Sequence, residues 1–177
     1  MSTRAPLQPR SKRLIQPTDY IAAELECLAF FRGIKPEHLQ SLARCATRTE
    51  FAAGDHILHT GNKANRFYLI ETGQVSVQTT TPAGRQLGIQ LLGPGDILGW
   101  SWIYPTYVWS FDAKAQTSGD AIFFHANQIR AECERDDALA CALFKRMAKV
   151  MLSRLHHMQQ GLVHLADHQW PLATPMA

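Results

Sequence analysis

Short apolar runs separated by glycine-containing turns dominate residues 51–99. Runs such as Phe67–Ile70 are brief, and Val75 and Val77 share one face of their run. Glycine adopts positive φ at little steric cost, so it suits tight corners between strands. Evenly spaced short strands are typical of an antiparallel sandwich or roll rather than of alternating strands and helices. The pattern therefore predicts a mainly β fold with flanking helices, an antiparallel β-roll of the jelly-roll type over residues 47–126.

Two helical patterns precede the predicted roll, within residues 18–46. From Tyr20 to Phe31, apolar residues recur every three or four positions, and Gly33 is expected to end this helix. A second helix is expected to begin near Pro36, because the missing N–H of proline costs nothing in a first helical turn.

The residues after the roll, 127–168, predict a short helix over 128–134 capped by Asn127, then a long helix over 136–167. One apolar stripe of the long helix is expected to pack on the roll and consists of Leu139, Leu143, Met147 and Val150. A second stripe advances in alternating steps of three and four, the heptad pattern of a coiled-coil seam. Its members are Cys141, Phe144, Ala148, Met151, Leu155, Met158, Leu162 and Leu165. This stripe predicts a homodimer through the C-terminal helix, with burial inside a single chain as the alternative.

Charge is distributed unevenly. Residues 1–17 carry four basic residues and no acidic one, so they are expected to form a disordered basic arm. Residues 18–168 are expected to form the single domain, and residues 169–177 a tail. With a net charge of +3 overall and +4 in the arm, the rest carries −1, which disfavours a nucleic-acid-binding body. Nine residues follow His168, too few for a helix-turn-helix, so we expect no DNA-binding domain in this chain.

The expected location is the cytoplasm. The sequence has no run of about 18 apolar residues to cross a membrane, and its N-terminus lacks the apolar region of a secretory signal. The four cysteines are far apart and form no Cys-x-x-Cys pair, which favours reduced thiols over a disulfide or a metal site.

Four spaced motifs carry a resemblance to a known family. They read Gly54-Asp55, then Ile57-x-x-x-Gly61, then Phe67-Tyr-Leu-Ile-x-x-Gly-x-Val-x-Val77, then Leu92-Gly-Pro-Gly-Asp-x-Leu-Gly99. In this order they resemble the cyclic-nucleotide-binding domain family, which includes the catabolite-activator regulators, over about residues 28–155. The resemblance implies a ligand segment after Pro-Gly-Asp. In the family, a Glu there accepts from the ribose hydroxyl, and an Arg about ten residues later neutralises the cyclic phosphate.

The matching segment departs from this pattern. Trp100 stands at the position of the Glu, and Trp109 or, as second choice, Val108 stands at that of the Arg. Ser110 fits a phosphate-contacting hydroxyl, and Lys114 could substitute as a cation, although Asp112 shares its strand face. The candidate ligand-binding residues are Gly99, Trp100, Ser101, Trp102, Trp109 and Ser110.

Loss of both charged groups predicts weak cyclic nucleotide binding or none. A hydrogen bond to a charged group contributes about 1.5–3 kcal/mol, so losing the Arg alone lowers affinity roughly ten- to a hundredfold. The N–H groups of Ser101 and Trp102 could remain as an anion nest if a short helix starts here. Six aromatic residues lie within residues 100–111. They either line a pocket for a different ligand or fill the vacated one, and the sequence leaves both open.

The sequence thus predicts a stand-alone regulatory or ligand-sensing protein and no enzyme. No cofactor is predicted, and the implied ligand is a cyclic nucleotide or another small molecule. One alternative is genuine cAMP or cGMP binding through backbone amides and Ser110. Another is a cupin-like metalloenzyme using His56 and His59, although residues three apart on a strand face opposite sides. A purely structural dimer without a ligand is a third.

Overall fold

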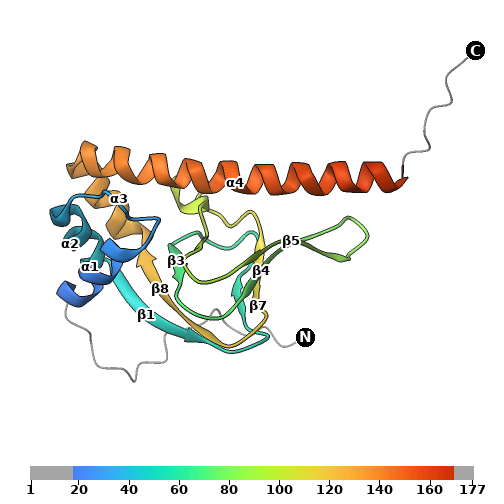
Figure 1. Cartoon of the computed structure of the whole chain (residues 1–177), viewed down its shortest axis with the longest axis horizontal. Coiled ribbons are helices and arrows are strands. Elements are labelled where there is room, and N and C mark those ends of the chain that lie inside the picture. The colour runs from blue at the N-terminus through green and yellow to red at the C-terminus, as the bar shows by residue number, and fades with distance from the viewer. Residues whose placement is uncertain (1–17, 170–177) are drawn as a thin grey trace, which may run out of the picture.

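The computed structural model describes residues 18–169, so the predicted basic arm and all but the first residue of the predicted tail lie outside the described residues. Helices flank the strands at both ends of this chain segment (Figure 1). In order, the elements are α1 (Thr18–Cys27), α2 (Pro36–Arg44), β1 (Ala46–Phe51), β2 (His56–Leu58), β3 (Arg66–Ile70), β4 (Val75–Thr80), β5 (Gln86–Leu92), β6 (Ile97–Leu98), the 3-10 turn η1 (Ser101–Ile103), β7 (Asp112–Ala115), β8 (Gly119–His125), α3 (Ala126–Arg135) and α4 (Asp137–Gln169).

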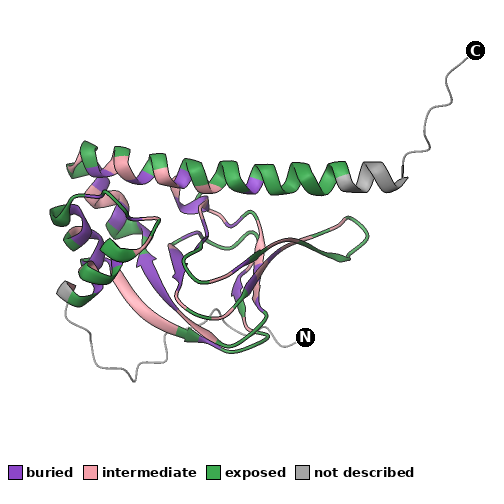
Figure 2. Cartoon of the chain, in the orientation of Figure 1, coloured by how far each residue is buried: buried purple, intermediate pink, exposed green. Residues whose placement is uncertain are grey.

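Two four-stranded antiparallel sheets form the roll, which confirms the predicted fold class. One sheet has the order β1-β8-β3-β6 and the other β2-β7-β4-β5. Strands β3 and β8 in the first sheet are buried along most of their length, whereas β5 at the edge of the second is largely exposed (Figure 2). Among the fully buried side chains are Phe67, Leu69 and Ile122. The core therefore lies between the sheets and under the helices that cover one end of the roll.

Glycine at position 73 is required by the turn between β3 and β4. Its φ is +81°, and a Cβ there would lie 2.7 Å from the carbonyl oxygen of Ser118. A side chain would need both an unfavourable φ and a shift of backbone.

Helix α1 is shorter than predicted. It ends at Cys27, and residues 28–33 form tight turns, with the N–H of Phe31 donating to the oxygen of Leu28 at 3.0 Å. Phe31 is nevertheless fully buried. The apolar spacing thus correctly predicted that Phe31 is buried, although Phe31 lies in a turn rather than in a helix. Helix α2 begins at Pro36, as predicted.

Helix α4 begins directly after Asp136, whose side chain caps it. The Oδ1 atom of Asp136 accepts from the N–H of Ala138 at 2.9 Å and of Leu139 at 3.0 Å. These bonds satisfy donors that a helix start leaves free. The other oxygen lies 2.9 Å from Nε2 of His38 on α2. The predicted cap of α3 was wrong, because α3 already starts at Ala126 and the Asn127 amide oxygen accepts instead from Arg130.

The two stripes of α4 lie in different environments. Leu139, Leu143 and Met147 are buried against the rest of the chain, which confirms the first stripe. In the second stripe, Phe144, Met151, Leu155, Met158 and Leu162 are 41% to 67% exposed. Figure 2 shows this helix as exposed along most of its second half. Leu165 lies beyond the side chains that the structure describes. The homodimer stays a prediction.

The described helices are also too short or too polar to cross a membrane.

Candidate ligand site

Residues 99–110, here called the cassette, connect β6 to β7. They contain η1, the short helical turn at Ser101, and their last residues pair with the loop between β2 and β3. The N–H of Trp109 donates to the oxygen of Asn62 at 2.9 Å, and the N–H of Gly61 donates back to the oxygen of Trp109 at 2.9 Å. The end of the cassette is therefore fixed by backbone bonds.

Arg130 of α3 holds the cassette from a second side. Its Nη1 atom donates to the carbonyl oxygen of Trp102 at 3.0 Å, and its guanidinium carbon lies 4.2 Å from the ring centre of Tyr107. A cation over an aromatic face is attracted by the ring. Tyr107 itself has a φ of +46°, the one positive φ of a non-glycine residue in the described chain. The strained loop is thus held by contacts to two different elements.

The indole of Trp109 fills the space beside Gly99. Trp109 is only 6% exposed, and a Cβ on Gly99 would lie 2.8 Å and 2.9 Å from its Cζ3 and Cη2 atoms. With a φ of +86° as well, this position requires glycine. The cavity left beside the ring has a volume of about 10 Å³, room for roughly one water molecule.

The structure brings most of the predicted site residues together, but not the side chain of Trp102. Trp102 is fully buried and stacks on Phe67, with ring centres 5.2 Å apart. Trp100 is partly exposed, and its ring lies 6.4 Å from that of Phe111. The predicted residues that line the small cavity are Gly99, Trp100, Ser101, Trp109 and Ser110.

Lys114 does not line this cavity. It lies on β7 opposite His56 and Ser76, while Ala113 and Ala115 point into the roll. Its neighbour Asp112 accepts from the N–H of Thr60 at 2.9 Å. Lys114 thus lies two residues further along β7 than Asp112, which does line the cavity.

One charged residue that sequence reasoning missed reaches the cassette from α4. Arg154 is 8% exposed and lines the small cavity, and its Nη2 atom donates to the carbonyl oxygen of Ile97. Its Nε atom is buried and finds no partner within residues 18–169. Burial lowers the pKa of Arg154 to about 10, against the opposing effect of Asp96, so the group is cationic at neutral pH. The sequence signal was present, because Arg154 lies four residues after Val150 in the stripe that faces the roll.

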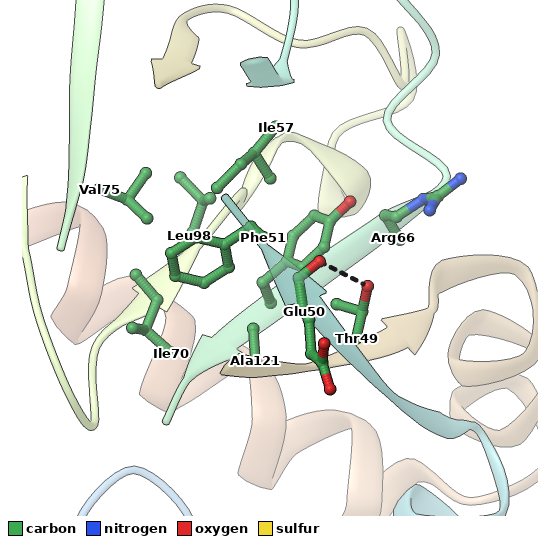
Figure 3. Close-up of a pocket in the computed structure, with 10 residues that line it drawn as sticks. Thr49, Glu50, Phe51, Ile57, Arg66, Ile70, Val75, Leu98 and Ala121 are labelled. Atoms are coloured by element: carbon green, nitrogen blue, oxygen red, sulfur yellow. Dashed lines mark hydrogen bonds between the residues drawn. The ribbon is translucent and has the colours of Figure 1, made fainter. Parts of the chain in front are cut away.

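The interior of the roll is apolar and nearly full. A cavity of about 10 Å³ lies between the sheets, and Figure 3 shows the side chains of Phe51, Ile57 and Leu98 pointing toward one another around it. The charged ends of Glu50 and Arg66 point away.

The imidazoles of His56 and His59 lie closer together than predicted. Their rings stack at 5.0 Å with an interplanar angle of 11°, although we expected them on opposite faces of a strand. That expectation was wrong because β2 ends at Leu58 and its pairing shifts register after His56. Within the described residues, no group of three or more His, Cys, Asp or Glu side chains is placed to hold a metal ion.

Comparison with known proteins agrees with this geometry. The model of the cyclic nucleotide-binding domain family matches residues 48–136, from β1 to the residue after α3. The chain belongs to this family. The resemblance found in the sequence is thereby confirmed, and with it membership of a family of regulatory proteins.

Individual relatives are more distant. A cAMP-activated global transcriptional regulator of Mycobacterium tuberculosis, described as CRP-like, is 25% identical over 141 residues. That match covers 76% of this chain, and the chain spans 58% of the length of that relative.

Two solved structures share the fold. The first is a cyclic nucleotide-binding protein of Geobacter metallireducens, with a TM-score of 0.69, 24% identity, and coverage of 76% of this chain and 98% of that one. The second is a cyclic nucleotide-binding domain of Methylobacillus flagellatus, with a TM-score of 0.71, 16% identity, and coverage of 90% and 86%.

Proposed function

We propose that this chain is a non-enzymatic regulatory protein whose cassette is closed by Trp109 and binds cyclic nucleotides weakly or not at all. The observation that carries this proposal is the contact of the Trp109 ring with Gly99, which leaves about 10 Å³ beside it. A nucleotide needs a pocket of several hundred Å³. By the resemblance, the ribose position holds Trp100, and the phosphate position holds Trp109 or, as second choice, Val108, instead of charged side chains.

The energy of opening supports the same conclusion. A buried tryptophan hides about 150–250 Å² from water, which at about 25 cal/mol per Å² amounts to roughly 4–6 kcal/mol. A ligand that has to expel Trp109 loses this stabilisation from its binding free energy. At about 1.4 kcal/mol per decade, the affinity falls by roughly three orders of magnitude or more.

One observation favours genuine cyclic nucleotide binding as a second candidate. Arg154 lines the cassette cavity and has a buried Nε atom without a partner in residues 18–169. This cation comes from α4 rather than from the cassette, and it could meet a phosphate if the indole swung out. Buried polar groups are normally hydrogen-bonded, so an unpartnered guanidinium nitrogen is an unusual feature for a closed site.

Calorimetric titration of the full chain with cAMP and with cGMP tests the proposal. We expect a dissociation constant above about 1 mM, or no measurable heat. The matched variants are Trp100→Glu, Trp109→Arg and the double substitution. The double variant should bind better than either single one, because a lone charge in this pocket would stay unpaired. A wild-type dissociation constant of about 1 μM or lower would overturn the closed-site proposal and favour the second candidate.

We also propose that the protein acts as a parallel homodimer through α4. The support is the exposed stripe from Phe144 to Leu162, which keeps the heptad spacing along α4. Apolar residues at these spacings are buried against a second helix in coiled coils. A dimer would couple any change at the cassette to the partner subunit through Arg154 and the helix that carries it.

A further inference from the structure

A groove with a volume of about 700 Å³ lies beside α4, and its lining shares Arg154 with the cassette cavity. Its walls come from the turn between α1 and α2, from the segment joining β5 to β6, and from three turns of α4. Figure 1 shows α4 running along the roll, with β5 beneath it. This volume is within the range of small-molecule sites, about 300–1,000 Å³.

Cations dominate the groove. Its lining contains Arg32, Lys145, Arg146, Lys149 and Arg154, against a single carboxylate, that of Asp96. Arg146 is engaged with backbone, since its two terminal nitrogens donate to the oxygens of Ala142 at 2.8 Å and of Arg32 at 2.6 Å. The side chains of Arg32, Lys145 and Lys149 make no ion pair or hydrogen bond with the residues whose side chains the structure describes, 18 and 20–163. Such a concentration of one sign of charge repels itself and attracts an anion.

Two buried polar groups in the same lining also lack partners. The Nε atom of Arg154 and the Oε1 atom of Gln90 are buried without a hydrogen bond in the described chain, and both residues line the groove. Buried polar atoms in folded proteins are nearly always satisfied by protein, water or ligand. Because Arg154 is 92% buried, its unpaired nitrogen is an observation independent of the surface charges.

The floor of the groove is apolar. Phe30 and Val150 are partly exposed beside it, and Leu92 is buried beneath. Lys145 and Lys149 lie one helical turn apart, about 6 Å along the axis, a spacing that suits two neighbouring phosphate groups. The lining therefore fits one compact molecule with an aromatic or apolar body and several negative charges.

We propose that this groove binds a nucleoside diphosphate or a small molecule of the same chemistry, an aromatic body carrying two or more phosphate charges. The phosphates contact Lys145, Lys149 and Arg32, and the body packs on Phe30 and Val150. This site shares Arg154 with the cassette cavity, but the proposed ligand contacts lie outside the cassette.

Calorimetric titration of the full chain with ADP, at about 50 mM salt, tests the assignment. We expect saturable binding tighter than about 1 mM that weakens as salt is raised, because the contacts are exposed charges. Lys145→Gln and Lys149→Gln should each weaken it about tenfold or more, as expected for losing a bond to a charged group. Lys63→Gln, an exposed lysine far from the groove in the β2–β3 loop, is the matched control and should leave it unchanged.

Pyrophosphate and adenosine separate the two parts of the ligand. Both should bind more weakly than ADP, since each offers only half of the contacts. Adenosine binding as tightly as ADP would overturn the proposed phosphate contacts. Pyrophosphate binding as tightly as ADP would overturn the proposed packing of an aromatic body on the apolar side chains. Absence of ADP binding at about 10 mM, or unchanged affinity in both groove variants with unaltered melting temperatures, would overturn the site as a whole.

Discussion

The cassette and the groove beside α4 are two hollows that share one wall, Arg154, and they differ in almost every other respect. The cassette retains about 10 Å³ and is lined mainly by aromatic and apolar side chains. The groove has about 700 Å³ and is lined by five cations. The cassette, where the resemblance implies the ligand, is thus nearly filled, and the larger groove has its lining outside residues 99–110.

This difference shows how little of a binding site a fold determines. The two sheets, the turn η1 and the long helix are all present, and the family match over residues 48–136 covers η1 and nearly all of both sheets and ends just before α4. One side chain, the Trp109 indole, occupies the space beside Gly99. We therefore expect ligand capacity to depend on a few side chains rather than on the fold.

Emptying the cassette gives the largest expected effect. Trp109→Ala removes a buried ring and should lower the free energy of unfolding by about 3–5 kcal/mol, because the fixed cassette backbone cannot collapse into the cavity. Denaturant titration measures this loss. Tyr104→Ala, at a position that is 66% exposed in the same segment, is the control and should change stability by less than about 0.5 kcal/mol. A loss below about 1 kcal/mol in Trp109→Ala would mean that the indole is not what keeps the cassette closed.

The outer face of α4 gives the next largest effect. Leu155→Asp places a charge on the exposed stripe of α4. In a dimer this charge would be buried in an apolar seam, so the substitution should weaken the dimer at least about a hundredfold. Sedimentation at roughly tens of micromolar should then show monomers. Gln160→Asp, exposed on the opposite side of the heptad, should leave the dimer intact. A monomeric wild-type protein at this concentration would contradict the dimer, whereas the proposed ADP site lies within one chain and does not depend on this outcome.

Sequence reasoning was most successful where a pattern is local. Glycine-bounded apolar runs correctly predicted the antiparallel strands, because alternation and turn chemistry are properties of a few neighbouring residues. It could not decide between an aromatic pocket and a filled one, since the contact of Trp109 with Gly99 depends on tertiary packing. Arg154 was missed for the same reason, because reaching the cassette requires the packing of a helix fifty residues further along the chain.

The contact between Gly99 and Trp109 predicts a smaller, coupled effect. Gly99→Ala should lower stability by about 1–3 kcal/mol, from the strained φ and from the clash with the ring. In a Trp109→Ala background the clash disappears while the strain remains, so the cost should be smaller. A double-mutant cycle in denaturant measures the difference. Equal costs in both backgrounds would show that the ring does not press on Gly99.

Helix α4 forms one wall of the groove and also carries Arg154, which lines the cassette cavity. The contacts that fix the start of α4 therefore matter for both sites. The hydrogen bond from the N–H of Leu139 holds the pKa of the Asp136 carboxyl group below its ordinary value of 3.8, and the side chain of His38 lowers it further. A carboxyl group whose pKa is lowered on folding contributes stability above the unfolded pKa and loses it as the pH falls through the folded one.

Asp136→Asn keeps an oxygen that can cap the helix but removes the charge. Its stability should therefore fall less steeply than that of the wild type as the pH is lowered below about 4. Thermal melts across this range measure the slope, and Asp137→Asn serves as the control because Asp137 lies next in the chain but accepts no hydrogen bond from a described residue. If both variants follow the wild-type slope, the charge of Asp136 does not anchor α4. The position of α4, and of Arg154 on it, must then be fixed by the buried stripe of the helix alone.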